Sequence, residues 1–192
     1  MSDHAVPEYW LREGVERLLV DEAAIQRRVR ELGAQLAREI NDGKDIVLIP
    51  VLTGAIIFAA DLMRAIPSRV RIGMVSVSSY GASTTSQGAI RAGELPKGIT
   101  GKHVVIVDEI LDSGATVRLL RREIGALAPA SLRVCVLLRK QRAQALSTEC
   151  EMVGFDIPDE FVVGYGLDFN DEFRNMPFVG VLGQAAIRAR SG

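Results

Sequence analysis

Two acidic residues and a hydroxyl-rich turn follow a short apolar run within residues 104–116. The apolar run, residues 104–107, has no polar alternation, which is typical of a parallel strand covered on both faces. Asp108 and Glu109 come directly after it, where open α/β sheets bind their ligands. Carboxylates accept hydrogen bonds from vicinal hydroxyls or hold a divalent cation. The pair therefore indicates a sugar or a metal.

The turn that follows consists of Asp112, Ser113, Gly114, Ala115 and Thr116. Its glycine lets backbone N–H groups close around an anion, and the next helix directs the positive end of its dipole to the same place. A phosphate monoester fits there. The plainer alternative is that these residues only turn the chain and cap a helix. The acidic pair favours a ligand site, because carboxylates beside a covered strand cost free energy unless something binds them.

The whole run resembles the phosphoribosyl-pyrophosphate motif of type I phosphoribosyltransferases, in which a hydrophobic strand, two acids and two residues precede Asp-Thr/Ser-Gly-x-Thr. The spacing matches residue for residue. The resemblance implies that Asp108 and Glu109 bind the ribose hydroxyls, and that residues 112–116 bind the 5′-phosphate. It also implies that Asp112 is the general base, or the hydrogen-bond acceptor, at N7 of a purine.

The elements that must position this run alternate between helix and strand. Asp21 is the predicted N-cap of an amphipathic helix that Gly43 ends. Further helices are predicted at residues 55–66 and 116–127, and strands at residues 46–51, 70–77, 104–107, 132–138, 161–165 and 178–182. This order predicts an α/β fold with a parallel, doubly wound sheet. The resemblance implies that the sheet is of the type I phosphoribosyltransferase kind.

One domain is expected over residues 1–192. Its core covers about residues 14–182, the extent of the resemblance, and a small hood is formed by about residues 151–192 with N-terminal contributions. A chain of 192 residues with 48% hydrophobic content buries a full core. A net charge of -1 leaves no basic footprint for nucleic acid.

The cellular location is expected to be cytoplasmic. Cys135 lies in an apolar run and Cys150 in a polar stretch, so two separate thiols in a reducing compartment are favoured over a disulfide. The sequence has no signal-peptide pattern and no apolar run of membrane-spanning length. We therefore expect neither a nucleic acid nor a membrane as a partner.

A long connection of biased composition occupies residues 78–101. Compact domains rarely contain such a connection without a function, although a mobile loop without one is an equal alternative from the residues alone. Purine phosphoribosyltransferases have a Ser-Tyr pair in a loop that closes over pyrophosphate. The resemblance therefore implies a lid that carries Ser79 and Tyr80 and keeps water from a reactive sugar cation.

The segment Leu52-Thr53-Gly54 is, from the residues alone, a tight turn between a strand and a helix. In the family this turn binds pyrophosphate through backbone amides at a non-proline cis peptide, here expected between Leu52 and Thr53. Many purine-salvage members have lysine or arginine where this chain has Thr53, so only the backbone role carries over. Arg174 matches an arginine that binds pyrophosphate.

The purine site is implied by two stretches that resemble the hood of hypoxanthine-guanine phosphoribosyltransferases, residues 154–170 and 174–177. In that family the aromatic at Phe161 stacks on the purine, where it can contribute about 1 to 3 kcal/mol. Leu167 packs on the opposite side, and backbone carbonyls near Val162 and Asp168 meet the edge that carries the amino group of guanine. Without the motif, Phe161 is equally a core aromatic.

Lys140 matches the family lysine that donates to purine O6. A lysine has three donors and no acceptor, and a 6-oxo group accepts whereas a 6-amino group donates, so adenine is expected to be rejected. The family often continues with Pro-Glu-Arg-Arg, but this chain has Gln141-Arg142-Ala143-Gln144. An arginine contact is therefore either missing or displaced onto Arg142.

Together the resemblance implies a purine-salvage enzyme. It transfers the phosphoribosyl group from phosphoribosyl pyrophosphate to N9 of hypoxanthine or guanine and gives IMP or GMP and pyrophosphate. Mg²⁺ is the expected cofactor, with Asp108, Glu109 and Asp168 as its acids, and a homodimer or homotetramer is the expected assembly. Two alternatives stay open: a xanthine or xanthine-guanine phosphoribosyltransferase, and a regulator that senses phosphoribosyl pyrophosphate without catalysis.

Overall fold

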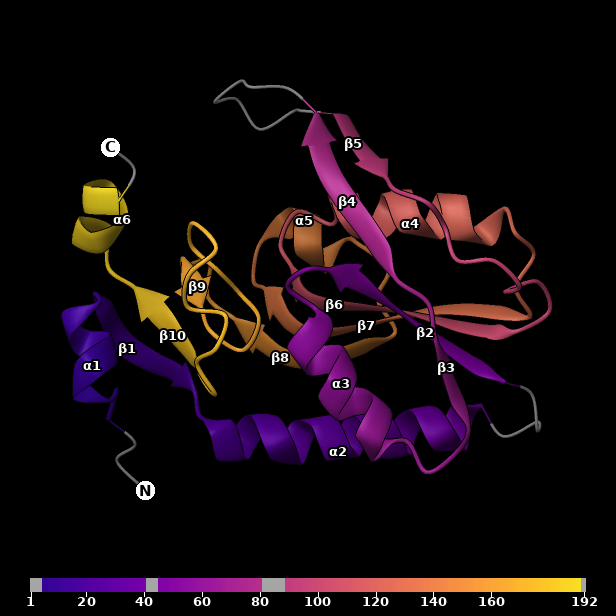
Figure 1. Ribbon diagram of the computed structural model, residues 1–192, viewed down its shortest axis with the longest axis horizontal. Helices are drawn as coiled ribbons and strands as arrows, with labels where there is room; N and C mark the ends of the chain where they lie inside the picture. Colours follow the sequence, from indigo (N-terminus) through magenta and orange to yellow (C-terminus); the bar gives the residue numbers. More distant parts are fainter. Residues whose placement is uncertain (1–4, 41–44, 81–88, 191–192) are drawn as a thin grey trace.

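The computed structural model describes residues 5–40, 45–80 and 89–190, which form two sheets and the helices around them (Figure 1). The large sheet contains β2 (Ile46–Leu52), β3 (Val70–Ile72), β4 (Val75–Tyr80), β5 (Ala89–Ala92), β6 (His103–Leu111), β7 (Ser131–Lys140) and β8 (Met152–Ile157). The small sheet contains β1 (Val15–Val20), β9 (Val162–Val163) and β10 (Val179–Leu182). The helices are α1 (Glu8–Arg12), α2 (Glu22–Glu39), α3 (Ile56–Ala65), α4 (Ala115–Gly125), α5 (Ala143–Leu146) and α6 (Gln184–Arg190).

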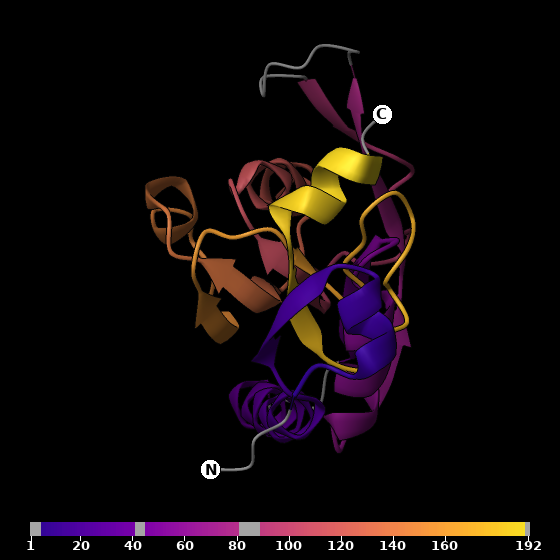
Figure 2. The same cartoon turned by 90° about the vertical axis from the view of Figure 1, so that its left-hand side faces the viewer.

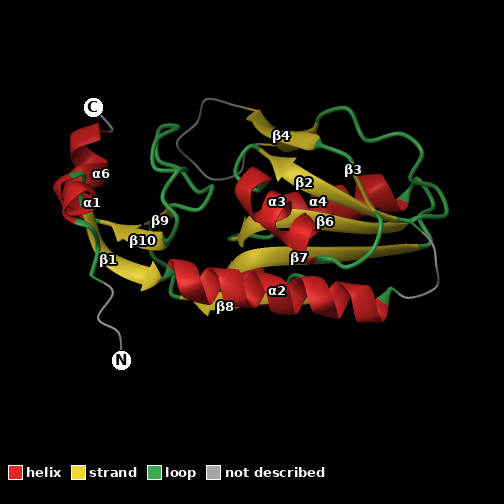
Figure 3. Ribbon diagram, turned by 60° about the horizontal axis from the view of Figure 1, so that its bottom comes forward, coloured by secondary structure: helices red, strands yellow, loops and turns green. Residues whose placement is uncertain are grey.

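The large sheet is doubly wound, as predicted. Its order is β5-β4-β2-β6-β7-β8 with β3 beside β2, and β2, β6, β7 and β8 pair in parallel. Alternate residues of β6 enter different apolar clusters: Val105 and Val107 pack with residues of α2 and α3, whereas Val104 and Ile106 pack with residues of α4. Figure 3 shows α2 lying along the sheet. Among the described helices, none is long and apolar enough to cross a bilayer.

The strand predicted at residues 70–77 is interrupted. β3 and β4 both run parallel to β2, but they are separated at Gly73, whose N–H donates to the carbonyl of Leu48. A Cβ at Gly73 would lie 2.7 Å from Pro96, so a larger residue has no room there.

The long connection after this region is partly strand. β4 extends to Tyr80 and pairs antiparallel with β5, with Ser79 opposite Ile90. Residues 81–88 and Gly43, the predicted end of the first helix, lie outside the described residues.

The hood is a small antiparallel sheet of order β1-β10-β9. Figure 2 shows it from the side where α1 and α6 flank it. The predicted hood range of residues 151–192 is wrong at its start, because β8 pairs with β7 in the large sheet. The strand predicted at residues 161–165 is shorter in the structure, where β9 contains only Val162 and Val163. The strand ends there because Gly164, Tyr165 and Gly166 have positive φ angles, which extended strands do not have.

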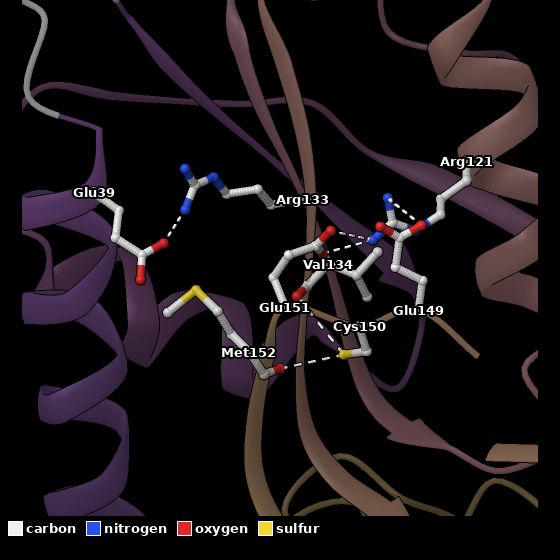
Figure 4. A network of polar contacts seen from close by, with 8 residues as sticks. All are labelled: Glu39, Arg121, Arg133, Val134, Glu149, Cys150, Glu151 and Met152. Atoms are coloured by element: carbon white, nitrogen blue, oxygen red, sulfur yellow. Dashed lines mark hydrogen bonds and ion pairs between the residues drawn. The ribbon is translucent and has the colours of Figure 1, made fainter. Parts of the chain in front are cut away.

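A polar network fastens α4 to the edge of the large sheet (Figure 4). Nη2 of Arg121, on α4, lies 2.6 Å from both carboxylate oxygens of Glu151, directly before β8. Glu151 also accepts the backbone N–H of Val134 at 2.7 Å. Burial alone raises the pKa of Glu151, but the hydrogen bonds from Arg121 and Val134 outweigh it and lower the pKa. The position of α4 is thus set by contacts remote from its first turn.

Candidate active site

A cleft of about 340 Å³ opens where β2 and β6 end, beside the first half of β4. Val51, Leu52 and Val77 line one part of it, and the continuous run of residues 108–117 lines the rest. Since the carboxyl ends of parallel strands meet at one edge of a sheet, this is the expected place for a ligand. The structure therefore brings together the predicted acidic pair and the predicted phosphate turn.

The acidic pair is buried at the end of β6. Asp108 is only 6% exposed, and its Oδ1 accepts the N–H of Glu109 at 3.0 Å. Burial raises the pKa of Asp108 well above its ordinary value, and the charge of Glu109 raises it further. Burial also raises the pKa of Glu109, whose Oε2 has no hydrogen-bond partner among the described residues. Such a pair needs hydroxyl donors or a cation to offset the loss of water.

The phosphate turn lies between β6 and α4. Gly114 has φ +76° and is the N-cap of α4, but no side chain caps the helix there. Oγ of Ser113 accepts the N–H of Ala115 over a long distance of 3.4 Å. The first N–H groups of α4 are thus left largely to a ligand, as an anion site requires. The simple capping alternative does not describe this helix start.

The turn after β2 packs directly against the acidic pair. The expected cis peptide joins Leu52 and Thr53. A Cβ at Gly54 would lie 2.1 Å from Oε1 of Glu109, and a Cβ at Gly166, in the hood, would lie 2.1 Å from the carbonyl oxygen of Gly54. Gly166 also has φ +103°, which favours glycine. The three segments approach so closely that neither glycine position has room for a side chain.

The hood adds an acid and an arginine to this region. Arg174 pairs with Asp168 at 2.8 Å and donates to the carbonyl of Gly166 at 2.9 Å. The charge of Asp168 contributes to raising the pKa of Glu109, and that of Arg174 lowers it. Within the described ranges, however, no group of three or more His, Cys, Asp or Glu side chains is placed to hold a metal ion. The three predicted metal acids are therefore not gathered into one coordination site.

Four charged side chains form a cluster beside the phosphate turn. Lys140, at the end of β7 and 12% exposed, lies 3.2 Å from Asp112 and 3.4 Å from Asp159. Arg142 lies 2.5 Å from Asp112 and 3.5 Å from Asp159. Arg142 thus reaches the predicted general base, while Asp159 had no predicted role. Nothing in the sequence marks Asp159, which follows β8, as a partner of Lys140.

The predicted aromatic of the base site is a surface ring. Phe161 is 39% exposed, so it is not a core residue. Phe169 meets it edge-on, with ring centroids 5.4 Å apart and an interplanar angle of 88°. Val162 and Leu167 are buried nearby in the chain. The sequence did not single out Phe169, which holds the ring of Phe161 while leaving part of it free to stack.

Comparisons with known proteins agree on one family. The model of the phosphoribosyl transferase domain matches residues 18–170. The hypoxanthine-guanine phosphoribosyltransferase of Mycobacterium tuberculosis (strain H37Rv) is 42% identical over 174 residues, covering 88% of this chain and 86% of that protein. The hypoxanthine phosphoribosyltransferase of Escherichia coli (strain K12) is 39% identical over 166 residues, covering 85% and 93%. A solved hypoxanthine phosphoribosyltransferase of Staphylococcus aureus superposes with a TM-score of 0.85 at 34% identity, covering 94% of this chain and 98% of that one.

The burial of Asp108 leads to a prediction about stability. The pKa of Asp108 is higher in the folded state than in the unfolded state. The contribution of Asp108 to folding stability is therefore fully present below its unfolded pKa and is lost as the pH rises through its folded pKa. Asp108→Asn removes the charge, so the ligand-free variant should melt a few degrees higher at pH 7, about what 1 kcal/mol produces in a domain of this size. The difference should shrink towards pH 4 in thermal melts.

Asp156→Asn is the matched control. The hydrogen bond from Arg139 lowers the pKa of Asp156, so this variant should lose stability at pH 7, with the difference again vanishing in acid. A melting temperature of Asp108→Asn below that of the wild type at pH 7 would contradict the account of the buried pair.

Proposed function

The chain belongs to the phosphoribosyl transferase domain family, and on that premise we propose that it transfers the 5-phosphoribosyl group of phosphoribosyl pyrophosphate to N9 of hypoxanthine or guanine. The products are IMP or GMP and pyrophosphate, and the role is purine salvage. One observation carries the proposal: a buried acidic pair and an uncapped helix start line the same cleft. We further infer a homodimer or homotetramer that works in the cytoplasm.

The ribose 5-phosphate half of the substrate binds along residues 108–116. The hydroxyls of the ribose donate to Asp108 and Glu109, which satisfies the unpaired Oε2 of Glu109. The 5′-phosphate accepts from the backbone N–H groups at the start of α4, with Ser113 and Thr116 supplying hydroxyls. Gly114 in the left-handed region allows the backbone to curve around this group.

The pyrophosphate half binds between the turn after β2 and the hood. The pyrophosphate accepts from backbone amides of the segment Leu52-Thr53-Gly54, and Arg174 supplies a positive charge. Ser79 and Tyr80, at the end of β4, complete this part of the site. Arg174 is already held by Asp168 and the carbonyl of Gly166, so its guanidinium is oriented before substrate arrives. Preorganised positive charge at a leaving group stabilises the charge that develops there.

Mg²⁺ is the proposed cofactor, and the residues present fit it. Mg²⁺ is usually held by one or two carboxylates together with substrate phosphates rather than by an all-protein cage. The buried pair with its unpaired Glu109 oxygen, and Asp168 in the hood, provide acids of this kind. When bound, the cation neutralises charge on the pyrophosphate leaving group.

The purine binds against the charged cluster and the exposed aromatic. Phe161 stacks on one face and Leu167 packs on the other, with the backbone near Val162 and Asp168 at the amino edge. Lys140 donates to O6, and Asp112 accepts the proton, or a hydrogen bond, at N7. Asp112 already accepts hydrogen bonds from Lys140 and Arg142, so it is held as an acceptor at this edge.

Catalysis then rests on orientation and electrostatics. Departure of pyrophosphate leaves cationic character at C1′ of the ribose, and the base attacks that carbon through N9. The cleft aligns the two reactants. The lid carrying Ser79 and Tyr80 excludes water, which would otherwise attack C1′ and hydrolyse phosphoribosyl pyrophosphate. No covalent intermediate with the protein is needed.

Steady-state assays with four bases test this function. With phosphoribosyl pyrophosphate and Mg²⁺, hypoxanthine and guanine should be converted and adenine should not. A kcat/KM for xanthine above those of both would favour the xanthine-preferring alternative. Binding of phosphoribosyl pyrophosphate without turnover of any base would favour the non-catalytic regulator.

The metal requirement is a separate prediction. Chelation with excess EDTA should abolish transfer, because the pyrophosphate charge then lacks its cation, and added Mg²⁺ or Mn²⁺ should restore it. Residual metal is measured in the same samples. Full turnover in metal-free enzyme would refute the cofactor.

Lys140→Met tests the choice of base. The variant keeps the aliphatic stem but loses the donor, so kcat/KM for hypoxanthine and guanine should fall by on the order of 2 kcal/mol in transition-state binding, with the KM for phosphoribosyl pyrophosphate little changed. Lys102→Met is the matched control: Lys102 pairs with Asp45 at 3.0 Å, at the opposite end of β6. An unchanged preference for 6-oxopurines over adenine in Lys140→Met would place the base elsewhere.

A further inference from the structure

We propose that Arg118 is a positioning residue for the phosphate turn, an inference that rests on the proposed function. Arg118 lies in the first turn of α4, two residues after the phosphate turn of residues 112–116. Its backbone N–H donates to the carbonyl of Gly114. It is not among the residues that line the described cleft. Its effect on a bound phosphate therefore passes through the turn.

The guanidinium of Arg118 joins two segments that are distant in sequence. Its Nη2 donates to the carbonyl oxygen of Ser113 at 3.1 Å, and its Nη1 donates to Oγ1 of Thr148 at 2.7 Å. Thr148 is only 6% exposed and donates in turn to the carbonyl of Gln144 at 2.7 Å. The turn is thus fastened to the buried end of the α5 segment.

These contacts control which backbone groups face the ligand. A carbonyl oxygen directed at a phosphate would repel it, and the carbonyl of Ser113 is instead bonded to Arg118, a residue that does not line the cleft. A Cβ at Gly114 would lie 2.0 Å from Oγ1 of Thr148 and 2.7 Å from Nη1 of Arg118. The back of the turn is therefore in direct contact with both side chains, which fix its N–H groups towards the cleft.

The position of α4 itself does not depend on Arg118. Val117, Leu120 and Ile124 are buried against the sheet, and Arg121 holds the helix to Glu151 with two contacts of 2.6 Å. Loss of Arg118 should therefore disturb the turn and leave the helix in place. This separates a positioning role from a general contribution to folding.

The experiment compares Arg118→Gln with Arg122→Gln. Arg122 lies one turn further along α4, is exposed, and pairs with Glu123. Calorimetric titration with ribose 5-phosphate should give about tenfold weaker binding for Arg118→Gln, the usual loss for a charge-assisted hydrogen bond, and no change for Arg122→Gln. Titration with Mg²⁺-pyrophosphate should be unaffected in both. In steady-state assays the KM for phosphoribosyl pyrophosphate should rise similarly, with kcat and the melting temperature nearly unchanged.

Two further variants distinguish positioning from direct binding of the phosphate. Thr148→Val removes the hydroxyl that Arg118 contacts and should weaken ribose 5-phosphate in the same way, and the double variant should be little worse than either single one. Arg118→Lys, which can reach one partner but not both, should recover part of the affinity.

Several results would overturn the proposal. These are unchanged ribose 5-phosphate affinity in Arg118→Gln, an equal loss in Arg122→Gln, or a loss in Arg118→Gln that Thr148→Val does not share, which would make Arg118 a direct ligand. Failure of the proposed function is distinguishable, since a wild-type protein that binds ribose 5-phosphate but converts no purine contradicts the function alone.

Discussion

The rest of the candidate site depends on the burial of two adjacent carboxylates at the end of β6. β6 is covered on both faces, so the backbone that carries Asp108 and Glu109 is fixed by apolar packing. The same packing removes the water that would solvate the carboxylates, and the pKa values of both rise. A sheet that was open on one face would spare this cost, but it would hold the acids less rigidly. The fold thus gives up some stability of the ligand-free protein for a rigidly held acidic pair, which is the proposed ribose site.

The cations of the candidate site are paired with carboxylates, whereas the buried acidic pair lies apart from them, in a chain whose net charge is -1. In the proposed function, the buried acids Asp108 and Glu109 bind the sugar, whereas the cations bind the pyrophosphate and the purine. Lys140 and Arg142 share Asp112 and Asp159, and Arg174 is held by Asp168. Each cation therefore keeps a carboxylate partner before substrate arrives, which limits both repulsion between cations and the loss of side-chain freedom on binding.

The sequence predicted what is local in the chain. The strand, the acids and the turn of residues 104–116 are contiguous, so their order alone predicted where they meet. The hood was harder, because β1 pairs with β10 across almost the whole length of the chain and the pattern of β8 does not say which sheet it joins. The break between β3 and β4 includes Gly73, which lies close to Pro96, a neighbour distant in the sequence. The charged cluster around Asp112 and the contacts of Arg118 with Ser113 and Thr148 likewise depend on tertiary neighbours, which charge patterns in the sequence do not specify.

Close packing of glycines links the hood to the acidic pair. Gly166 rests on the backbone of Gly54, and Gly54 rests on the carboxylate of Glu109, with no side chain between them. Arg174 reaches the carbonyl of Gly166 and lowers the pKa of Glu109, so the hood also interacts electrostatically with the same carboxylate. A ligand that ionises or displaces Glu109 therefore acts on Gly54 and, through it, on the hood. Because close-packed backbone segments do not deform continuously, binding at the ribose hydroxyls and placement of the hood arginine are expected to occur together.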